Sequence, residues 1–228
     1  MPCQIQCYDC NKMVTHLASH RTVCPKSRKN RCKLGKSYRG LRHRGPPKHK
    51  NVMKGKDVFF VLDVSGSMAG TRLNQAKQVI QESFDVMDKH DRASVIAFDT
   101  NAFMKLYPRS VDQLRRQKEI KPLLNRIWAN GLTALWDAVD LTLGNVYDKT
   151  RPTKIVVVSD GGDNSSTKTR TQVEAKFKEY PNIQMLFVQI GDMVVQNKEF
   201  IAEINAEILN CDNIMNIKSQ VCQFVRVN

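Results

Sequence analysis

Five oxygen-bearing side chains stand where strands or helices are expected to begin or end. They are Asp63, Ser65, Ser67, Thr133 and Asp160. The first three follow the apolar run 58–62, and the last follows a second apolar run at 155–158. Carboxylate and hydroxyl oxygens suit a hard cation such as Mg²⁺, which takes oxygen ligands at roughly 2.0–2.1 Å. Because a glycine lies between the two serines, the backbone can turn tightly there, and we predict a divalent-cation site.

Such a site needs a scaffold that brings distant segments to one edge. Alternating apolar patterns predict strands at about 57–63, 92–98, 102–107, 153–159 and 184–190, with a weaker sixth near 213–226. Helices are expected at about 71–89, 111–127, 132–147, 169–179 and 196–208. This alternation predicts an α/β fold, a doubly wound and mostly parallel sheet with an antiparallel hairpin over 98–107. Ligands of such sheets bind beyond the carboxyl ends of the strands, where both aspartates are expected.

Three segments resemble the metal-ion-dependent adhesion site (MIDAS) of von Willebrand factor A-type (vWA) domains. They are Asp63-Val64-Ser65-Gly66-Ser67-Met68, Gly131-Leu132-Thr133-Ala134-Leu135 and Val158-Ser159-Asp160-Gly161. The resemblance covers about residues 55–228 and implies a Rossmann-like vWA domain over 57–228. It implies that the two serines and Thr133 reach Mg²⁺, Mn²⁺ or Ca²⁺ directly, while the two aspartates coordinate the ion or hold its waters. It also implies that an Asp or Glu carboxylate of another protein completes the coordination.

The same loops lack residues that several enzyme classes require. An aspartyl phosphatase needs a second carboxylate two residues after the first, where this chain has Ser65. The segment 66–70 does not place its serine centrally as G-x-S-x-G requires, and 70–72 is not the Gly-Lys-Ser/Thr of a P-loop. No histidine lies near in sequence to activate a serine. We therefore expect a non-catalytic interaction module.

The net charge is concentrated in the first quarter of the chain. Residues 1–56 hold 15 Lys+Arg and one acidic residue, which gives +14, whereas residues 57–228 hold 21 of each and give zero. Few apolar groups occur over 26–56, so we expect a flexible basic linker there. Such an arm would bind nucleic acid or another polyanion by releasing counterions, although charge runs are often only solvated linkers. The residues expected to do so are Lys26, Arg28, Lys29, Arg31, Lys33, Arg39, Arg42 and Arg44.

Five of the seven cysteines also lie in this arm. A C-x₂-C pair and a histidine four residues before a cysteine predict a tetrahedral Zn²⁺ site within residues 1–25, because i and i+4 share one helix face. The expected ligands are Cys7, Cys10, His20 and Cys24, with Cys3 and His16 as rival ligands. The segment resembles small C2HC zinc fingers of the TRAF-type and ubiquitin-binding kinds.

Together these features predict an intracellular protein, cytoplasmic or nuclear. The sequence shows no charged leader with an apolar core and no run of about 18–20 apolar residues. Clustered cysteines in a reducing compartment favour metal binding over disulfides. The leading hypothesis is an interaction module tethered by its finger and arm. Two alternatives stay open: a structural or assembly protein whose arm binds RNA or DNA, and a ubiquitin-pathway adaptor.

Overall fold

The computed structural model describes residues 5–6, 13–14, 55–191, 198–204 and 206–227. The chain divides into two units, Met1–Lys50 and Asn51–Asn228. In the first unit, the short strands β1 (Ile5–Gln6) and β2 (Met13–Val14) pair antiparallel.

The predictions made for the basic arm fall mostly outside this description. The expected zinc ligands, their two rivals and the eight expected polyanion-binding residues all lie outside the described residues. The zinc finger and the polyanion contact therefore stay predictions.

The second unit is built on a six-stranded sheet with the order β5-β4-β3-β6-β7-β8. Its strands are β3 (Asp57–Asp63), β4 (Arg92–Phe98), β5 (Ala102–Ser110), β6 (Thr153–Ser159), β7 (Ile183–Ile190) and β8 (Glu207–Cys211). All neighbouring strands run parallel except β4 and β5, which form an antiparallel hairpin. The predicted α/β fold with a mostly parallel sheet is confirmed.

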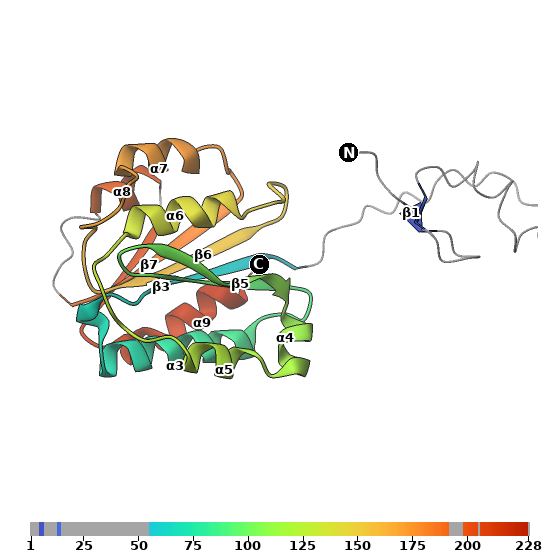
Figure 1. Cartoon of the computed structure of the whole chain (residues 1–228), viewed down its shortest axis with the longest axis horizontal. Helices are drawn as coiled ribbons and strands as arrows, with labels where there is room; N and C mark the ends of the chain where they lie inside the picture. Colours follow the sequence, from blue (N-terminus) through green and yellow to red (C-terminus); the bar gives the residue numbers. More distant parts are fainter. Residues whose placement is uncertain (1–4, 7–12, 15–54, 192–197, 205, 228) are drawn as a thin grey trace, which may run out of the picture. The chain divides into compact units, whose positions relative to one another are not determined.

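Helices cover both faces of this sheet (Figure 1). They are α3 (Thr71–Val86), α4 (Val111–Gln117), α5 (Ile120–Asn125), α6 (Leu135–Gly144), α7 (Arg170–Phe177), α8 (Lys198–Glu203) and α9 (Lys218–Arg226), with 3₁₀ turns η2 (Gly66–Met68) and η3 (Ile214–Ile217). One face carries α6, α7 and α8, and the other carries α3, α5 and α9. Strands β3 and β6 are buried along their whole length, and their central residues, 58–62 and 155–158, are apolar toward both helix layers.

Each helix layer forms its own apolar cluster with the sheet. On the α3 side, the rings of Phe60 and Phe84 stack with centroids 5.4 Å apart. On the α6 side, the ring of Trp136 lies 4.9 Å from that of Phe200, and this tryptophan is buried. The two helix layers pack against the sheet from both sides, so the strand ends are fixed and position the loops that follow them.

Two predicted elements differ from the structure. The sixth strand is β8, and the segment expected to form it, 213–226, is η3 followed by α9. In α9 the buried residues Val221, Phe224 and Val225 follow helical spacing, which the sequence interpretation took for a strand pattern. The expected helix over 111–127 is broken into α4 and α5 because Lys118 adopts a left-handed conformation with φ of 52°.

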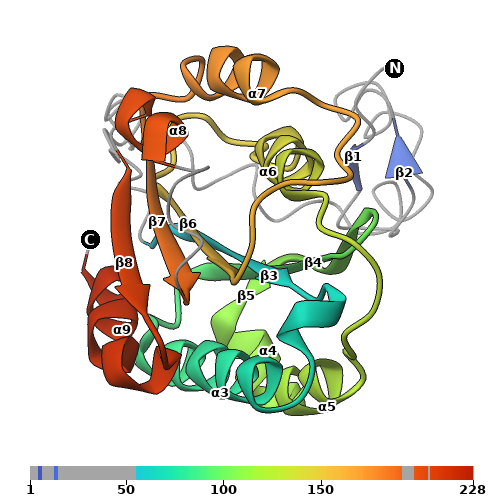
Figure 2. The ribbon, with the colours of Figure 1, turned by 90° about the vertical axis from the view of Figure 1, so that its left-hand side faces the viewer.

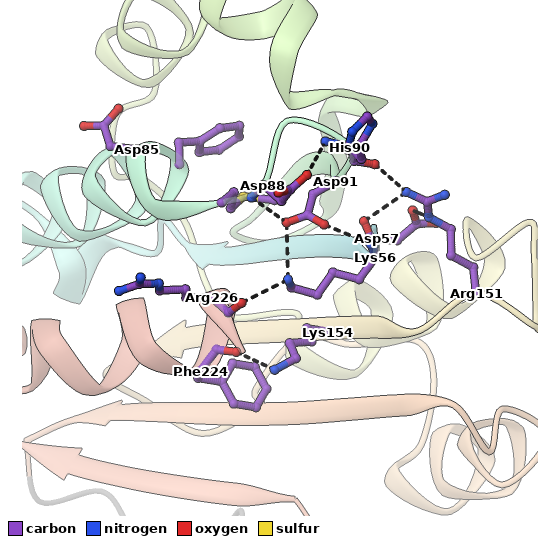
Figure 3. Close-up of polar contacts among 12 residues, drawn as sticks. Lys56, Asp57, Asp85, Asp88, His90, Asp91, Arg151, Lys154, Phe224 and Arg226 are labelled. Atoms are coloured by element: carbon purple, nitrogen blue, oxygen red, sulfur yellow. Dashed lines mark hydrogen bonds and ion pairs between the residues drawn. The ribbon is translucent and has the colours of Figure 1, made fainter. Parts of the chain in front are cut away.

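Buried charges gather at the amino edge of the sheet, where β3, β4 and β6 begin (Figure 3). Lys56 Nζ lies 3.3 Å from Asp91 Oδ2, and Asp91 Oδ1 also accepts a hydrogen bond from the Lys56 amide at 2.9 Å. Asp57 is shared by Arg92, whose Nε donates to Oδ1 at 2.8 Å, and by Arg151, whose Nε lies 2.6 Å from the same oxygen. Every carboxylate in this cluster has a cationic partner.

Two lysines of this edge also cap the last helix. Lys154 Nζ donates to Phe224 O at 2.5 Å and lies 4.6 Å from the centre of the Phe224 ring. Lys56 Nζ donates to Arg226 O at 3.4 Å. Both acceptors are carbonyls at the carboxyl end of α9, where positive charge is favoured. Burial lowers the pKa of Lys154, and the nearby charge of Lys56 lowers it further.

Candidate metal site at the carboxyl edge of the sheet

The register of β3 and β6 brings the first two acidic loops together. Leu62 of β3 pairs with Val158 of β6, so Asp63 and Ser159 end adjacent parallel strands side by side. Ser159 Oγ donates to Asp63 Oδ2 at 2.5 Å. Figure 2 views the domain from this edge, with η2 following β3. The carboxyl ends of the central strands therefore form the floor of the candidate site.

A chain of hydrogen bonds links four of the five predicted residues. The Ser65 amide donates to Asp63 Oδ1 at 2.8 Å. Ser65 Oγ and Ser67 Oγ lie 3.1 Å apart, and Ser67 Oγ donates to Asp160 Oδ1 at 2.8 Å. Asp63 is fully buried, whereas Ser67 is exposed. The oxygens thus lead from the sheet floor toward solvent.

The fifth residue, Thr133, is held at the same edge through its main chain. Its amide donates to Asn164 Oδ1 at 2.7 Å, and its carbonyl accepts from the Asn164 amide at 3.0 Å. The Gly66 amide donates to Gly131 O at 3.0 Å, which ties the loop before Thr133 to the loop after β3. Gly131 has φ of +77°, and a Cβ there would lie 2.6 Å from Thr100 Oγ1. This turn therefore requires glycine.

The structure adds residues that the sequence analysis did not select. Asp163 Oδ1 accepts from the Leu135 amide at 2.9 Å, and Ser166 Oγ accepts from the Trp136 amide at 2.9 Å. With Asn164, these side chains satisfy amides around the start of α6, which helices leave unpaired. Their residue types are those of helix caps, but they lie about thirty positions from the helix they serve. Only the fold brings them together.

Arg72 is a second residue that sequence reasoning missed. Its Nη1 donates to Asp160 Oδ2 at 2.7 Å and to Ser67 O at 3.3 Å. The Arg72 side chain is 48% exposed, whereas that of Asp160 is 1% exposed. Both carboxylate oxygens of Asp160 thus have donors, one a neutral hydroxyl and the other a cation on a long side chain.

The electrostatics of Asp63 favour a bound cation. Burial raises the pKa of Asp63 to about 6, although hydrogen bonds from Ser159 and Ser65 lower it, and the nearby Asp160 raises it further. Desolvation without a cationic partner destabilises the charged form, and a divalent ion close by would offset that penalty.

The donor set matches a hard divalent ion. Within the described residues, no group of three or more His, Cys, Asp or Glu side chains is placed to hold a metal. A site on this edge must therefore combine carboxylates with hydroxyls, as the predicted five residues do. Hydroxyl and carboxylate oxygens are ligands that suit Mg²⁺, Mn²⁺ and Ca²⁺.

A family model for the von Willebrand factor type A domain matches residues 57–221. The chain belongs to the vWA domain family. This confirms the predicted resemblance to vWA domains and the Rossmann-like architecture. Domains of this family typically serve as protein-interaction modules.

Curated relatives of this vWA domain are much longer proteins. Inter-alpha-trypsin inhibitor heavy chain H4 of Bos taurus is 32% identical over 87 residues, which are 37% of this chain and 9% of that protein. An uncharacterized protein of Synechocystis is 31% identical over 128 residues, which are 54% of this chain and 30% of that protein. The chain therefore spans less than a third of either relative.

Solved structures share the vWA fold at low identity. The protein BatB from Bacteroides thetaiotaomicron superposes with a TM-score of 0.59 at 20% identity, over 75% of this chain and 97% of that one. Proximal thread matrix protein 1 from the mussel byssus, solved with a zinc-occupied MIDAS motif, gives a TM-score of 0.61 at 16% identity over 75% of this chain and 45% of that one. No helix in the described part of this vWA chain is both long and apolar enough to cross a membrane.

Proposed function

We propose that the vWA domain binds Mg²⁺, or Mn²⁺ or Ca²⁺ in its place, through Asp63, Ser65, Ser67, Thr133 and Asp160, and that the ion captures an acidic side chain of another protein. The module acts by binding and not by catalysis. One observation carries the proposal: oxygens from the loops after β3 and β6 meet at the carboxyl edge, where hydrogen bonds already join four of the five residues.

The exposure of the site supports capture of a protein ligand. The hydroxyl of Ser65 is buried while Ser67 is exposed, so an ion between them faces solvent on one side. Leu132, next to Thr133, is 51% exposed. A partner that presents Asp or Glu beside an apolar residue would contact both the ion and this leucine.

Calorimetric titration with Mg²⁺ and Mn²⁺ tests the metal site. Asp63→Ala should abolish binding, and Asp160→Asn should weaken it at least about tenfold, since each removes a charged oxygen donor. Asp140→Asn is a matched control, because Asp140 pairs with Lys176 at 2.6 Å, away from the five proposed ligands. Wild-type protein that takes up no divalent ion would refute the proposal.

Affinity capture tests the partner. Full-length protein is used as bait in Mg²⁺ and in EDTA, and the Asp63→Ala variant is used in Mg²⁺. Proteins lost both in EDTA and with the variant are the metal-dependent ligands. An identical set in all three conditions would show that the ion has no part in recognition.

A second candidate function rests on the charge of the arm, +14 over residues 1–56. In this alternative the protein is associated with nucleic acid, and the affinity of the arm for nucleic acid falls as the salt concentration rises. Zn²⁺ organises residues 1–25. Retention on RNA or DNA that survives deletion of residues 1–50 would contradict an arm-based function. If the protein binds no zinc, the predicted zinc finger is refuted.

A further inference from the structure

The vWA domain is neutral only on average. Residues 102–128, which contain β5, α4 and α5, hold seven Lys+Arg and two Asp+Glu, for a net charge of +5. The other residues from 57 onward hold 14 basic and 19 acidic residues, for a net charge of −5. Positive charge is therefore collected at the β5 end of the sheet.

Some of these cations are used within the fold. Arg109 pairs with Glu119 at 2.6 Å, and Arg115 Nη2 donates to carbonyls at the end of α3. Others line a groove of about 470 Å³ between β5 and α5. Its cationic members are Lys105, Lys118 and Arg126, each of them exposed. The one carboxylate in the groove, that of Glu119, is the partner of Arg109, so the groove favours anions.

Exposed aromatic side chains accompany this groove. Phe103 and Lys105 lie on the edge strand β5, and Lys105 Nζ lies 5.1 Å from the centre of the Phe103 ring. Phe103 is 45% exposed. It pairs with Ala97, which belongs to the apolar cluster on the α3 side, so Phe103 lies on the face of the sheet that also carries α5. The strand thus presents an aromatic ring beside a cation of the groove.

A second aromatic belongs to the adjoining loop. Trp128 is 74% exposed and directly follows Ile127, which lines the groove together with Lys105. From there the chain runs to the β4–β5 turn, where the Leu132 amide donates to Thr100 Oγ1 at 3.1 Å. The loop over 127–132 and the first half of β5 therefore span the same distance side by side, with Trp128 on one and Phe103 on the other.

We propose that this basic–aromatic surface, formed by Phe103, Lys105, Lys118, Arg126 and Trp128, binds single-stranded nucleic acid. The cations contact phosphates, and bases stack on the aromatic rings, a combination that serves single strands without sequence preference. An acidic protein would use the cations but would leave two exposed aromatic rings without a matching contact. The surface contains none of the five proposed metal ligands.

Photo-crosslinking locates the contact in the full-length protein. A fluorescein-labelled oligo(U) of about 20 nucleotides, long enough for a typical single-strand site, is irradiated with the protein and the crosslinked peptides are identified by mass spectrometry. Crosslinks are expected at Phe103 or Trp128. Crosslinks confined to residues 1–56 would overturn the proposal, because the basic arm would then account for all binding.

Fluorescence anisotropy with the same oligo(U) separates stacking from charge. The variant Phe103→Ser should lose at least about fivefold in affinity with an unchanged salt dependence, because it removes stacking and no charge. Tyr147→Ser is its matched control, since Tyr147 is 69% exposed outside the proposed surface. Lys105→Gln/Arg126→Gln should lower the slope of log K against log salt by about 1.4, or about 0.7 for each lost phosphate contact. The control for charge is Lys89→Gln/Lys168→Gln.

Tryptophan emission gives a third measurement. Trp136 is 7% exposed and Trp128 is 74% exposed, so quenching by oligo(U) should report Trp128 and disappear in Trp128→Phe. Thermal melts check that each variant is folded. Variants that bind like their controls, or polyglutamate that competes as well as oligo(U), would refute recognition of nucleic acid by this surface.

Discussion

The two edges of the central sheet treat buried carboxylates in opposite ways. At the amino edge, Asp57 lies between two arginines and Asp91 pairs with Lys56, so each negative charge has a cation beside it. At the carboxyl edge, Asp63 accepts hydrogen bonds from the Ser159 hydroxyl and the Ser65 amide, which are neutral donors, and Asp160 is paired with the half-exposed Arg72. The amino edge neutralises its buried carboxylates within the chain. The carboxyl edge keeps a negative potential that a cationic ligand can neutralise.

This difference matters because buried charge is costly unless it is compensated. The amino edge compensates it within the chain, where Lys56 and Lys154 also hold the end of α9. At the carboxyl edge the chain does not offset the cost of burying the Asp63 carboxylate, and the raised pKa of Asp63 reflects that cost. Substitutions at the first edge should therefore change stability equally with and without divalent ions, whereas the effect of those at the second should depend on whether a divalent ion is present.

The largest effect is expected from Lys56→Met at the amino edge. It leaves the buried charge of Asp91 without its cation, and breaking such a pair typically costs about 3–5 kcal/mol. The free energy of unfolding should fall by that amount in urea titrations, equally in Mg²⁺ and in EDTA. Arg116→Met is the control, because the pair of Arg116 with Asp112 is solvent-exposed and should contribute at most about 1 kcal/mol. Equal losses in the two variants would remove the contrast between buried and exposed pairs.

Asp63→Asn should have the opposite sign at the carboxyl edge. Above about pH 6 in EDTA, the variant should be more stable than the wild type by about 2–3 kcal/mol, because it carries no desolvated charge. A raised folded-state pKa means that the folded protein holds the proton more tightly than the unfolded chain. Wild-type stability in EDTA should therefore fall as pH rises from about 4 to about 6, and the variant should not show this loss.

Saturating Mg²⁺ should reverse the order of these two proteins. The ion stabilises the wild type by binding the folded state, whereas the variant gains little. Urea titrations at several pH values with and without Mg²⁺ measure both effects. A variant less stable than the wild type in EDTA at neutral pH would show that the Asp63 carboxylate is already compensated within the chain.

The contrast between edges was only partly visible in the sequence. Apolar runs at 58–62 and 155–158 predicted the central strands, and the aspartates after them predicted the acidic edge. The sequence pattern failed at 213–226, because a short amphipathic helix with closely spaced apolar residues also suits a strand. It missed the separation of α4 from α5, which depends on one left-handed residue, Lys118.

The partners of the site residues could not be predicted in the same way. Arg72 lies on the first turn of α3 and is one of 36 basic residues, so nothing local marks it as the partner of Asp160. Asn164 meets Thr133 across 31 positions. Such contacts follow from the sheet register and the course of the loops, which a single sequence does not reveal.

Gly131→Ala tests how tightly the loop before Thr133 is specified. A left-handed conformation costs a residue with a Cβ about 1–2 kcal/mol, and here the Cβ would also press on Thr100 Oγ1. Stability should fall by about that amount, and Mg²⁺ affinity should fall as Thr133 is displaced. Gly55→Ala is the comparison at the amino edge, since its Cβ would lie 2.2 Å from His90 O. It should lower stability and leave Mg²⁺ affinity unchanged, and a loss of affinity there would mean that the two edges are coupled.

Arg72→Gln is expected to have the smallest effect, but it tests the difference between the two edges of the sheet most directly. A divalent ion that draws on Asp160 competes with the guanidinium for Oδ2 and is repelled by its charge. Because Arg72 is half-exposed, water screens both the competition for Oδ2 and the charge repulsion. Removing the guanidinium should therefore tighten Mg²⁺ binding by about 3–10-fold, or about 1 kcal/mol. Calorimetry at low and high salt measures the change, which should shrink as salt rises. Arg116→Gln removes an exposed cation from α4 and should leave Mg²⁺ affinity unchanged. Weaker binding in Arg72→Gln would show instead that the arginine orients Asp160 for the ion, and the carboxyl edge would then resemble the amino edge in needing its own cation.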